Sequence, residues 1–397
     1  MRFSRTDRSL LAQWWQTLDR PLLALILALL ACGLLLSLAA SPSIAIKRGF
    51  ATYHFVTRQL VFDFAAAAIV VAVSFQSPAH IRRLAWASLA IGLIGLIAVL
   101  LLGHDINGAR RWLSILGQTF QPSELLKPGF IVISAWLFAE TKRRPDMPAL
   151  PLAIALAALV AGLLIAEPDV GQTMLILSVW GGLYVISGQP WFGTLVLAVL
   201  AITLASGAYF VFPHVQVRVD QYIAHTFSGV SGDHSQVDRS LQAITEGGFF
   251  GRGPGEGQVK TVLPDAHTDF IFAVVAEEYG IIACLGLAGL FAAIAFRAVL
   301  RAGREADSAN RLAIFGLVMV FTLQAVINIS VNIGLMPAKG MTLPFISAGG
   351  SSTLAVALTL GMLLGLTRRR SDLANLKKPR LVGTVNPGEP RSVAGRS

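Results

Sequence analysis

The chain has 397 residues, of which 54% are hydrophobic and only 14% are charged, and its formal net charge is +10. Soluble proteins carry about 25% charged residues, and a single soluble core stops growing near about 250–300 residues, so the composition excludes one ordinary soluble domain and indicates lipid as the solvent. The net charge does not predict nucleic-acid binding, because basic residues in cytoplasmic loops also orient membrane helices. The two cysteines, Cys32 and Cys284, lie in apolar stretches and predict neither a disulfide framework nor a metal cluster.

Continuous apolar stretches predict an all-α, polytopic membrane protein with about ten transmembrane helices. A helical span needs about 20 apolar residues, and an outer-membrane barrel would instead show short alternating segments. The expected spans are 21–41, 59–76, 84–103, 124–140, 149–167, 172–188, 191–212, 269–299, 311–335 and 350–367.

Basic residues orient these spans. With ten helices, four groups of Arg and Lys fall on the side of the N-terminus: 82–83, 142–144, 297–311 and 368–370. This is the positive-inside pattern and predicts that both termini are cytoplasmic. The uncharged break at 187–190 is the weakest loop, and without it the C-terminal group would lie outside.

The chain is therefore expected to divide into three parts. Residues 1–20 form a cytoplasmic tail, and 21–370 form the transmembrane domain, which includes a large periplasmic loop at about 213–268. Residues 371–397 are rich in Lys, Arg, Pro, Gly and Ser, and they predict a disordered basic cytoplasmic tail.

Several cations in the predicted outside loops depart from the positive-inside pattern: Arg110, Arg111, Arg218, Arg239, Arg252, Lys260 and Lys339. One explanation is a membrane-bound anionic substrate, because guanidinium and ammonium groups pair well with phosphate oxygens. The alternative is that they are solvated or paired with nearby acidic side chains. The glycines at 247–257 are consistent with either a ligand-binding backbone or a flexible lid.

Asp269 directly precedes an apolar helix at the predicted membrane surface. One interpretation is structural, with Thr268 or Asp269 capping the helix. The other is catalytic, because a partly desolvated carboxylate is a stronger base than a free one.

Two ionisable residues lie within one predicted helix. Glu124 and Lys127 are three residues apart and so share a helix face, which allows an ion pair with either a structural or a cavity role. We make no functional assignment for Asp63, Glu140, Glu167 and Asp169, which fall near interfaces. His267 lies near Asp269, but no histidine spacing predicts a metal site.

Five motifs in order resemble the SEDS family of polytopic peptidoglycan glycosyltransferases, over nearly the whole chain to about residue 370. They are NGARRWL at 107–113, QPSELLK at 121–127, EPDVGQT at 167–173, LPDAHTDFIFAVVAEEYG at 263–280 and MPAKGMTLPFISAGGSS at 336–352. The run at 339–344 and the stretch at 236–257 are more similar to the FtsW branch, of the alphaproteobacterial type, than to the RodA branch. Ala348 departs from the family pattern, which has Tyr there.

The resemblance implies polymerisation of lipid II by inverting transfer, with Asp269 as the general base. It also implies substrate binding through Arg110, Arg111, Lys260, Lys339, His267 and Ser351, and a structural role for the Glu124–Lys127 pair. The metal requirement is left open, with a divalent cation such as magnesium as one candidate for the leaving group.

The same resemblance implies a location in the bacterial inner membrane at the division septum. The expected partners are lipid II, the undecaprenyl-pyrophosphate-linked glycan, membrane lipid, a class B penicillin-binding transpeptidase and other divisome proteins. The alternatives are a lipid II flippase, an elongation (RodA-type) polymerase and a pure scaffold for division proteins. Charge near helix ends and in outside loops, with little at mid-span, favours the enzyme over the flippase.

Overall fold

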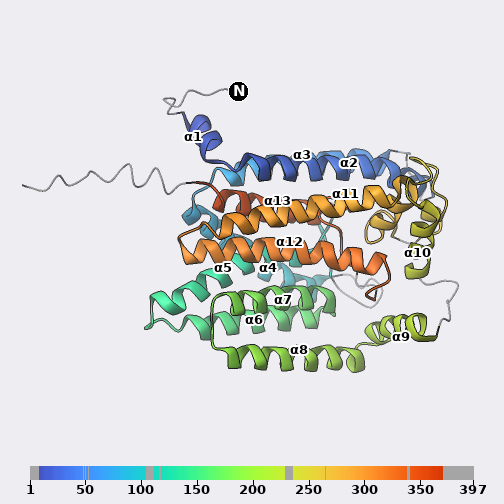
Figure 1. Cartoon of the computed structure of the whole chain (residues 1–397). Helices are drawn as coiled ribbons and strands as arrows, with labels where there is room; N and C mark the ends of the chain where they lie inside the picture. Colours follow the sequence, from blue (N-terminus) through green and yellow to red (C-terminus); the bar gives the residue numbers. More distant parts are fainter. Residues whose placement is uncertain are drawn as a thin grey trace, which may run out of the picture. The chain divides into compact units, whose positions relative to one another are not determined.

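The computed structural model describes residues 9–47, 49, 51, 53–103, 111–115, 118–228, 236–263, 265–337 and 340–369. Ten helices coincide with the ten predicted spans: α2 (Arg20–Lys47), α3 (His54–Ser74), α4 (Pro78–Leu102), α5 (Pro122–Arg143), α6 (Ala149–Ala166), α7 (Val170–Ile186), α8 (Trp191–Val211), α11 (Ile271–Ala302), α12 (Ser308–Asn332) and α13 (Gly350–Leu366). The prediction of an all-α polytopic membrane protein is confirmed (Figure 1).

The ten helices are not equally suited to lipid. Seven described helices are long and apolar enough to cross a membrane, and α7 and α13 are apolar but shorter. The remaining helix, α5, carries Glu124, Lys127 and Glu140, and nearly all of its side chains are buried. It packs against α4, α6, α7, α12 and α13, so the most polar span lies in the protein interior, where its charges can find partners.

Glycines bring α4 and α5 close together. A side chain at Gly92 would collide with Leu126, and one at Gly129 would collide with the backbone of Ala85 and Leu89. Small residues are the usual means of close helix packing in membranes, where no hydrophobic force drives helices together.

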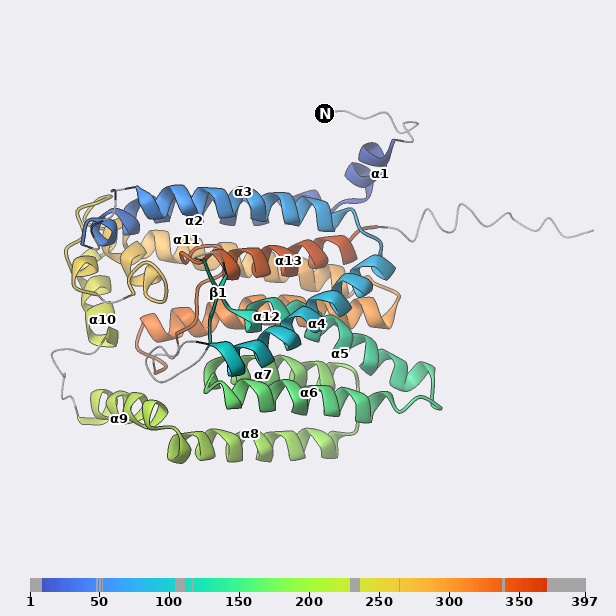
Figure 2. The same ribbon diagram turned by 180° about the vertical axis from the view of Figure 1, so that it is seen from behind.

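The predicted large loop contains two helices, α9 (Pro213–Ser228) and α10 (Gln236–Gly247), followed by the short 3₁₀ turn η1 (Val259–Thr261). Figures 1 and 2 show α9 and α10 at one end of the bundle, with α10 running across the direction of the spans. A small antiparallel hairpin, β1 (Leu113–Ile115) and β2 (Gln118–Phe120), precedes α5.

A separate small unit combines the first helix, α1 (Leu10–Thr17), with Arg368 and Arg369. The hydroxyl of Thr17 accepts from Nε of Arg368 at 3.0 Å, and its carbonyl accepts from the N–H of Arg369 at 3.0 Å.

Candidate active site

Two segments that precede helices meet around Asp269. The hydroxyl of Ser347 donates to the carbonyl of Thr268 at 2.5 Å, and the N–H of Ala348 donates to the carbonyl of His267 at 2.9 Å. The stretch before α11 is therefore fastened to the stretch before α13.

Two buried asparagines of α12 hold the backbone of Asp269. The side-chain amides of Asn328 and Asn332 donate to its carbonyl oxygen at 2.9 and 3.0 Å. Asn328 also donates to the carbonyl of Met341 at 2.6 Å, and the side-chain oxygen of Asn332 accepts from the N–H of Ala273 at 3.1 Å. These contacts fix where residue 269 lies without using its carboxylate.

The carboxylate of Asp269 is available as a base. Burial and then the negative charge of Asp265 raise its pKa to about 6, while Arg218 acts to lower it. The capping interpretation is wrong for the described helix, because α11 starts after Phe270 without any side-chain cap, and the hydroxyl of Thr268 donates to the carbonyl of Asp265 at 3.2 Å.

Two arginines lie around Asp169, and one of them, Arg218, also interacts with Asp269. Arg111 donates to the carbonyl of Pro168 at 2.5 Å, and its guanidinium lies 3.9 Å from the carboxylate of Asp169. On α9, the pKa of Arg218 is lowered by partial loss of solvent and by the charge of Arg111, whereas Asp269 and Asp169 act to raise it. Arg218 therefore lies near the candidate base, and Arg111 lies near Arg218 and Asp169.

Glu167 is buried beside Asp169. Burial, followed by the charge of Asp169, raises the pKa of Glu167 to about 8, against the opposing effect of Arg111. Burial and the neighbouring carboxylate therefore both favour the neutral form of the Glu167 carboxyl.

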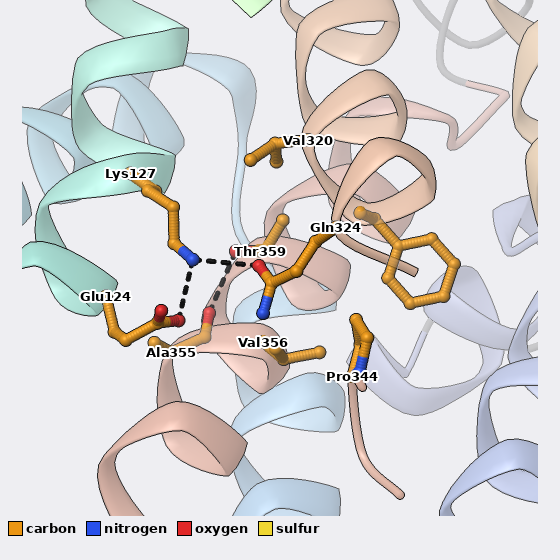
Figure 3. Close-up of a pocket in the computed structure, with 9 residues that line it drawn as sticks. Glu124, Lys127, Val320, Gln324, Pro344, Ala355, Val356 and Thr359 are labelled. Atoms are coloured by element: carbon orange, nitrogen blue, oxygen red, sulfur yellow. Dashed lines mark hydrogen bonds and ion pairs between the residues drawn. The ribbon is translucent and has the colours of Figure 1, made fainter. Parts of the chain in front are cut away.

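A buried chain of polar contacts connects this region to the bundle interior. The ammonium of Lys127 lies 2.7 Å from the carboxylate of Glu124 and donates to Oε1 of Gln324 at 2.8 Å (Figure 3). Gln172 donates to Glu124 at 2.7 Å, and Gln324 donates to the carbonyl of Thr342 at 3.1 Å. The predicted contact between Glu124 and Lys127 is thus observed, with a glutamine partner for each charge.

The helix N-termini of α5, α7 and α13 come together near Asp169. The N–H of Gln121 donates to the hydroxyl of Ser351 at 3.4 Å, and the side-chain amide of Gln121 donates to Asp169 at 3.3 Å. Helix N-termini favour anions, because their first N–H groups lack partners within the helix.

Comparison with known proteins identifies the family. The model of the cell cycle protein family FtsW/RodA/SpoVE matches residues 20–372. The chain belongs to this family. Among its relatives, the probable peptidoglycan glycosyltransferase FtsW of Caulobacter vibrioides is 42% identical over 93% of this chain and 94% of its own length. A protein of the same name from Alcanivorax borkumensis is 32% identical over 90% of this chain and 95% of its own length.

Solved structures of SEDS proteins share the fold. A chain from a structure described as the structural coordination of polymerization and crosslinking by a peptidoglycan synthase complex is 28% identical, with a TM-score of 0.72 over 89% of this chain and 98% of that one. The rod shape determining protein RodA of Thermus thermophilus is 27% identical, with a TM-score of 0.62 over 89% of this chain and 97% of that one. The predicted membership of the SEDS family is confirmed, and glycosyltransferase is the activity that the FtsW relatives' names carry.

Lys260 is buried and has an acidic partner. Its buried ammonium forms an ion pair with Glu278 and donates to the carbonyl of Gly255 at 3.2 Å. The neighbouring Glu277 accepts backbone N–H groups of Gln258 and Val259 at 2.5 and 2.7 Å and of Lys260 at 3.0 Å. These contacts tie the Gly-rich segment (residues 247–260) of this SEDS protein to α11 and give Lys260 an acidic partner, the alternative to a substrate contact that the sequence had left open.

Of the other residues predicted to bind substrate, His267 lies within the described structure. His267 is buried, with its ring centroid 5.7 Å from that of Phe55. Arg110 and Lys339 lie outside the described residues. Within the described ranges, no group of three or more His, Cys, Asp and Glu residues could hold a metal ion.

Proposed function

We propose that this SEDS protein polymerises lipid II into glycan strands with Asp269 as the general base. The observation that carries the proposal is a carboxylate of raised pKa, held by its backbone beside the start of α13 and lying in the field of Arg218, which is in turn near Arg111. A base and an anion-binding surface are the two groups that displacement of a pyrophosphate needs.

The proposed reaction is one inverting displacement. Asp269 takes the proton of the 4-hydroxyl of the acceptor's GlcNAc as that oxygen bonds to the anomeric carbon of the donor's MurNAc. The bond from that carbon to the pyrophosphate breaks, and the electron pair leaves with undecaprenyl pyrophosphate. Arg111, Arg218 and the N-termini of α5 and α13 stabilise the negative charge that develops there, whereas the N-terminus of α7 is capped by Asp169. Ser351 and His267 belong to the segments that frame this surface, while Arg110 and Lys339 remain proposed contacts from the sequence.

Lys260 takes a structural role in this proposal. A buried ammonium that is already paired with Glu278 would have to leave a low-dielectric site to reach a pyrophosphate, and separating a buried pair is costly. Lys260 therefore holds the Gly-rich segment rather than the substrate.

The chain is a multi-pass protein of the inner membrane, and both termini are cytoplasmic in the proposed orientation, with residues 371–397 as a basic tail. Cysteines introduced at Glu256 and Pro190 test this topology, because both residues are exposed. In intact spheroplasts, a membrane-impermeant maleimide should label Glu256→Cys and should label Pro190→Cys only after lysis. The reverse pattern would overturn the orientation.

The proposed setting is the division septum, with a class B penicillin-binding transpeptidase as the partner that crosslinks the new strands. This assignment is supported by the FtsW names of the relatives and by the synthase complex among the structural neighbours. The same names favour division over the elongation alternative.

A flippase is the competing function, because buried charge within a span can mark a transport path. The cavity beside Lys127 and Glu124 holds about one water molecule, far less than a sugar headgroup requires (Figure 3). Purified protein in liposomes with lipid II, with and without the transpeptidase, tests the two functions. The proposal expects glycan strands on a gel, whereas a flippase would make none under either condition.

The pH dependence of polymerisation should report the charges around Asp269. Because the base must be ionised, the rate should fall about tenfold per pH unit below pH about 6, the pKa of Asp269. Arg218→Gln removes a cation that favours the carboxylate and should move this acid limb to higher pH. Asp265→Asn removes a repelling anion and should move it to lower pH. If neither substitution moves the acid limb, the group that titrates there is not Asp269, and the assignment of the base is wrong.

A further inference from the structure

The Gly-rich segment carries two exposed aromatic side chains. Phe249 is 71% exposed and Phe250 is 83% exposed, although they follow directly after α10 and lie outside the ten spans. Exposed aromatic pairs on a water-facing loop are unfavourable, so such a pair indicates an apolar partner.

Backbone hydrogen bonds fix the level of these residues along α11. The N–H of Ile281 donates to the carbonyl of Gly248 at 3.0 Å, and that of Ile282 donates to the carbonyl of Phe249 at 3.4 Å. On the other side of the turn, the N–H of Arg252 donates to the carbonyl of Glu277 at 2.9 Å. Gly280, with φ 78° and ψ 178°, opens the helix at this point, which allows the segment to enter.

The position on α11 that these hydrogen bonds reach is the end of its apolar part. No charged residue occurs between Glu278 and Arg297. At about 1.5 Å per residue, the uncharged stretch from Ile281 to Phe296 is about 24 Å long, which fits within the thickness of about 30 Å of a bilayer's hydrocarbon core. The Phe249–Phe250 turn therefore lies where hydrocarbon gives way to headgroups.

The neighbouring surface continues into lipid. Ile282 is 53% exposed and Leu285 is 67% exposed on the apolar stretch of α11 directly below the turn. Figures 1 and 2 show α10, which leads into the turn, running across the end of the bundle, as an interfacial helix does.

We propose that Phe249 and Phe250 insert into the interfacial layer of the bilayer and anchor the Gly-rich segment to the lipid surface. This inference is independent of the proposed reaction. It identifies the partner as membrane lipid rather than a second protein, because the aromatic pair extends the exposed apolar surface of a helix that is long and apolar enough to cross a membrane. Since Glu277 and Glu278 bind the rest of the segment, the anchor and α11 together set the height of the Gly-rich segment above the membrane.

Spin labels on single cysteines test the anchor in nanodiscs that contain only the full chain, with Cys32 and Cys284 replaced. Phe250→Cys is the test position, Leu285→Cys is the lipid reference, and the exposed Glu256→Cys on the same segment is the water reference. The spin label at position 250 should be highly accessible to oxygen and poorly accessible to a nickel chelate, like the label at position 285. The label at position 256 should show the opposite accessibilities.

A label at 250 that behaves like the label at 256 would overturn the proposal, and it is also the result expected if a partner protein covers this surface in the cell. Phe249→Cys gives a second, independent position. Both replaced side chains are mostly exposed, so neither change removes buried packing from the fold.

Discussion

Asp269→Asn should lower the rate of glycan polymerisation by about 10²-fold or more, the usual contribution of a general base. Asn is nearly the same size as Asp, and the contacts from Asn328 and Asn332 go to the backbone carbonyl, which the substitution keeps. The side-chain amide cannot accept the proton of the attacking hydroxyl at neutral pH. The rate is measured on purified protein in liposomes, and thermal unfolding is measured on the same samples.

Asp265→Asn is the matched control, because it removes a neighbouring exposed carboxylate and should leave the polymerisation rate at neutral pH nearly unchanged. Unfolding temperatures of both variants should stay close to that of the wild type. Folded Asp269→Asn protein that polymerises lipid II at nearly the wild-type rate would remove Asp269 from the reaction.

Features that repeat along the chain could be predicted from the sequence. The apolar stretches locate the ten helices that coincide with the predicted spans, because a bilayer allows only continuous helical spans of a given length. The three-residue spacing of Glu124 and Lys127 was enough to predict their contact, since helix geometry alone brings such residues together.

Contacts between distant segments could not be predicted in this way. Asn328 and Asn332 reach Asp269 from about 60 positions along the chain, and in the sequence they are two polar residues in an apolar helix. Their spacing of four residues was the available signal, because it places both amides on one helix face. The sequence likewise showed Lys260 and Arg218 as equivalent outside cations, and only the fold pairs the first with Glu278 and brings the second near Asp269.

The Glu124–Lys127 pair is expected to be structural, and each charge has a second partner that makes this testable. Glu124 accepts from Gln172 and Lys127 donates to Gln324. Removing one partner of a buried pair costs about 3–5 kcal/mol, so Glu124→Lys or Lys127→Glu alone should strongly reduce both stability and activity. A glutamine amide can rotate to offer either its oxygen or its nitrogen, so both glutamines can serve a reversed pair.

Exchanging the charges, by combining Glu124→Lys with Lys127→Glu, should therefore restore part of what each single change loses. Restoration stays incomplete because the amide nitrogen of Gln324 also donates to Thr342, a contact that rotation would break. We would measure the unfolding temperature and the polymerisation rate of the wild type, of both single variants and of the double variant. Together these values give the interaction free energy between residues 124 and 127. The partly exposed pair Arg252–Glu246, at 2.9 Å, is the control, and its exchange should change stability by no more than about 1 kcal/mol. A folded double variant that is as inactive as the single variants would instead mean that Glu124 or Lys127 contacts the substrate directly.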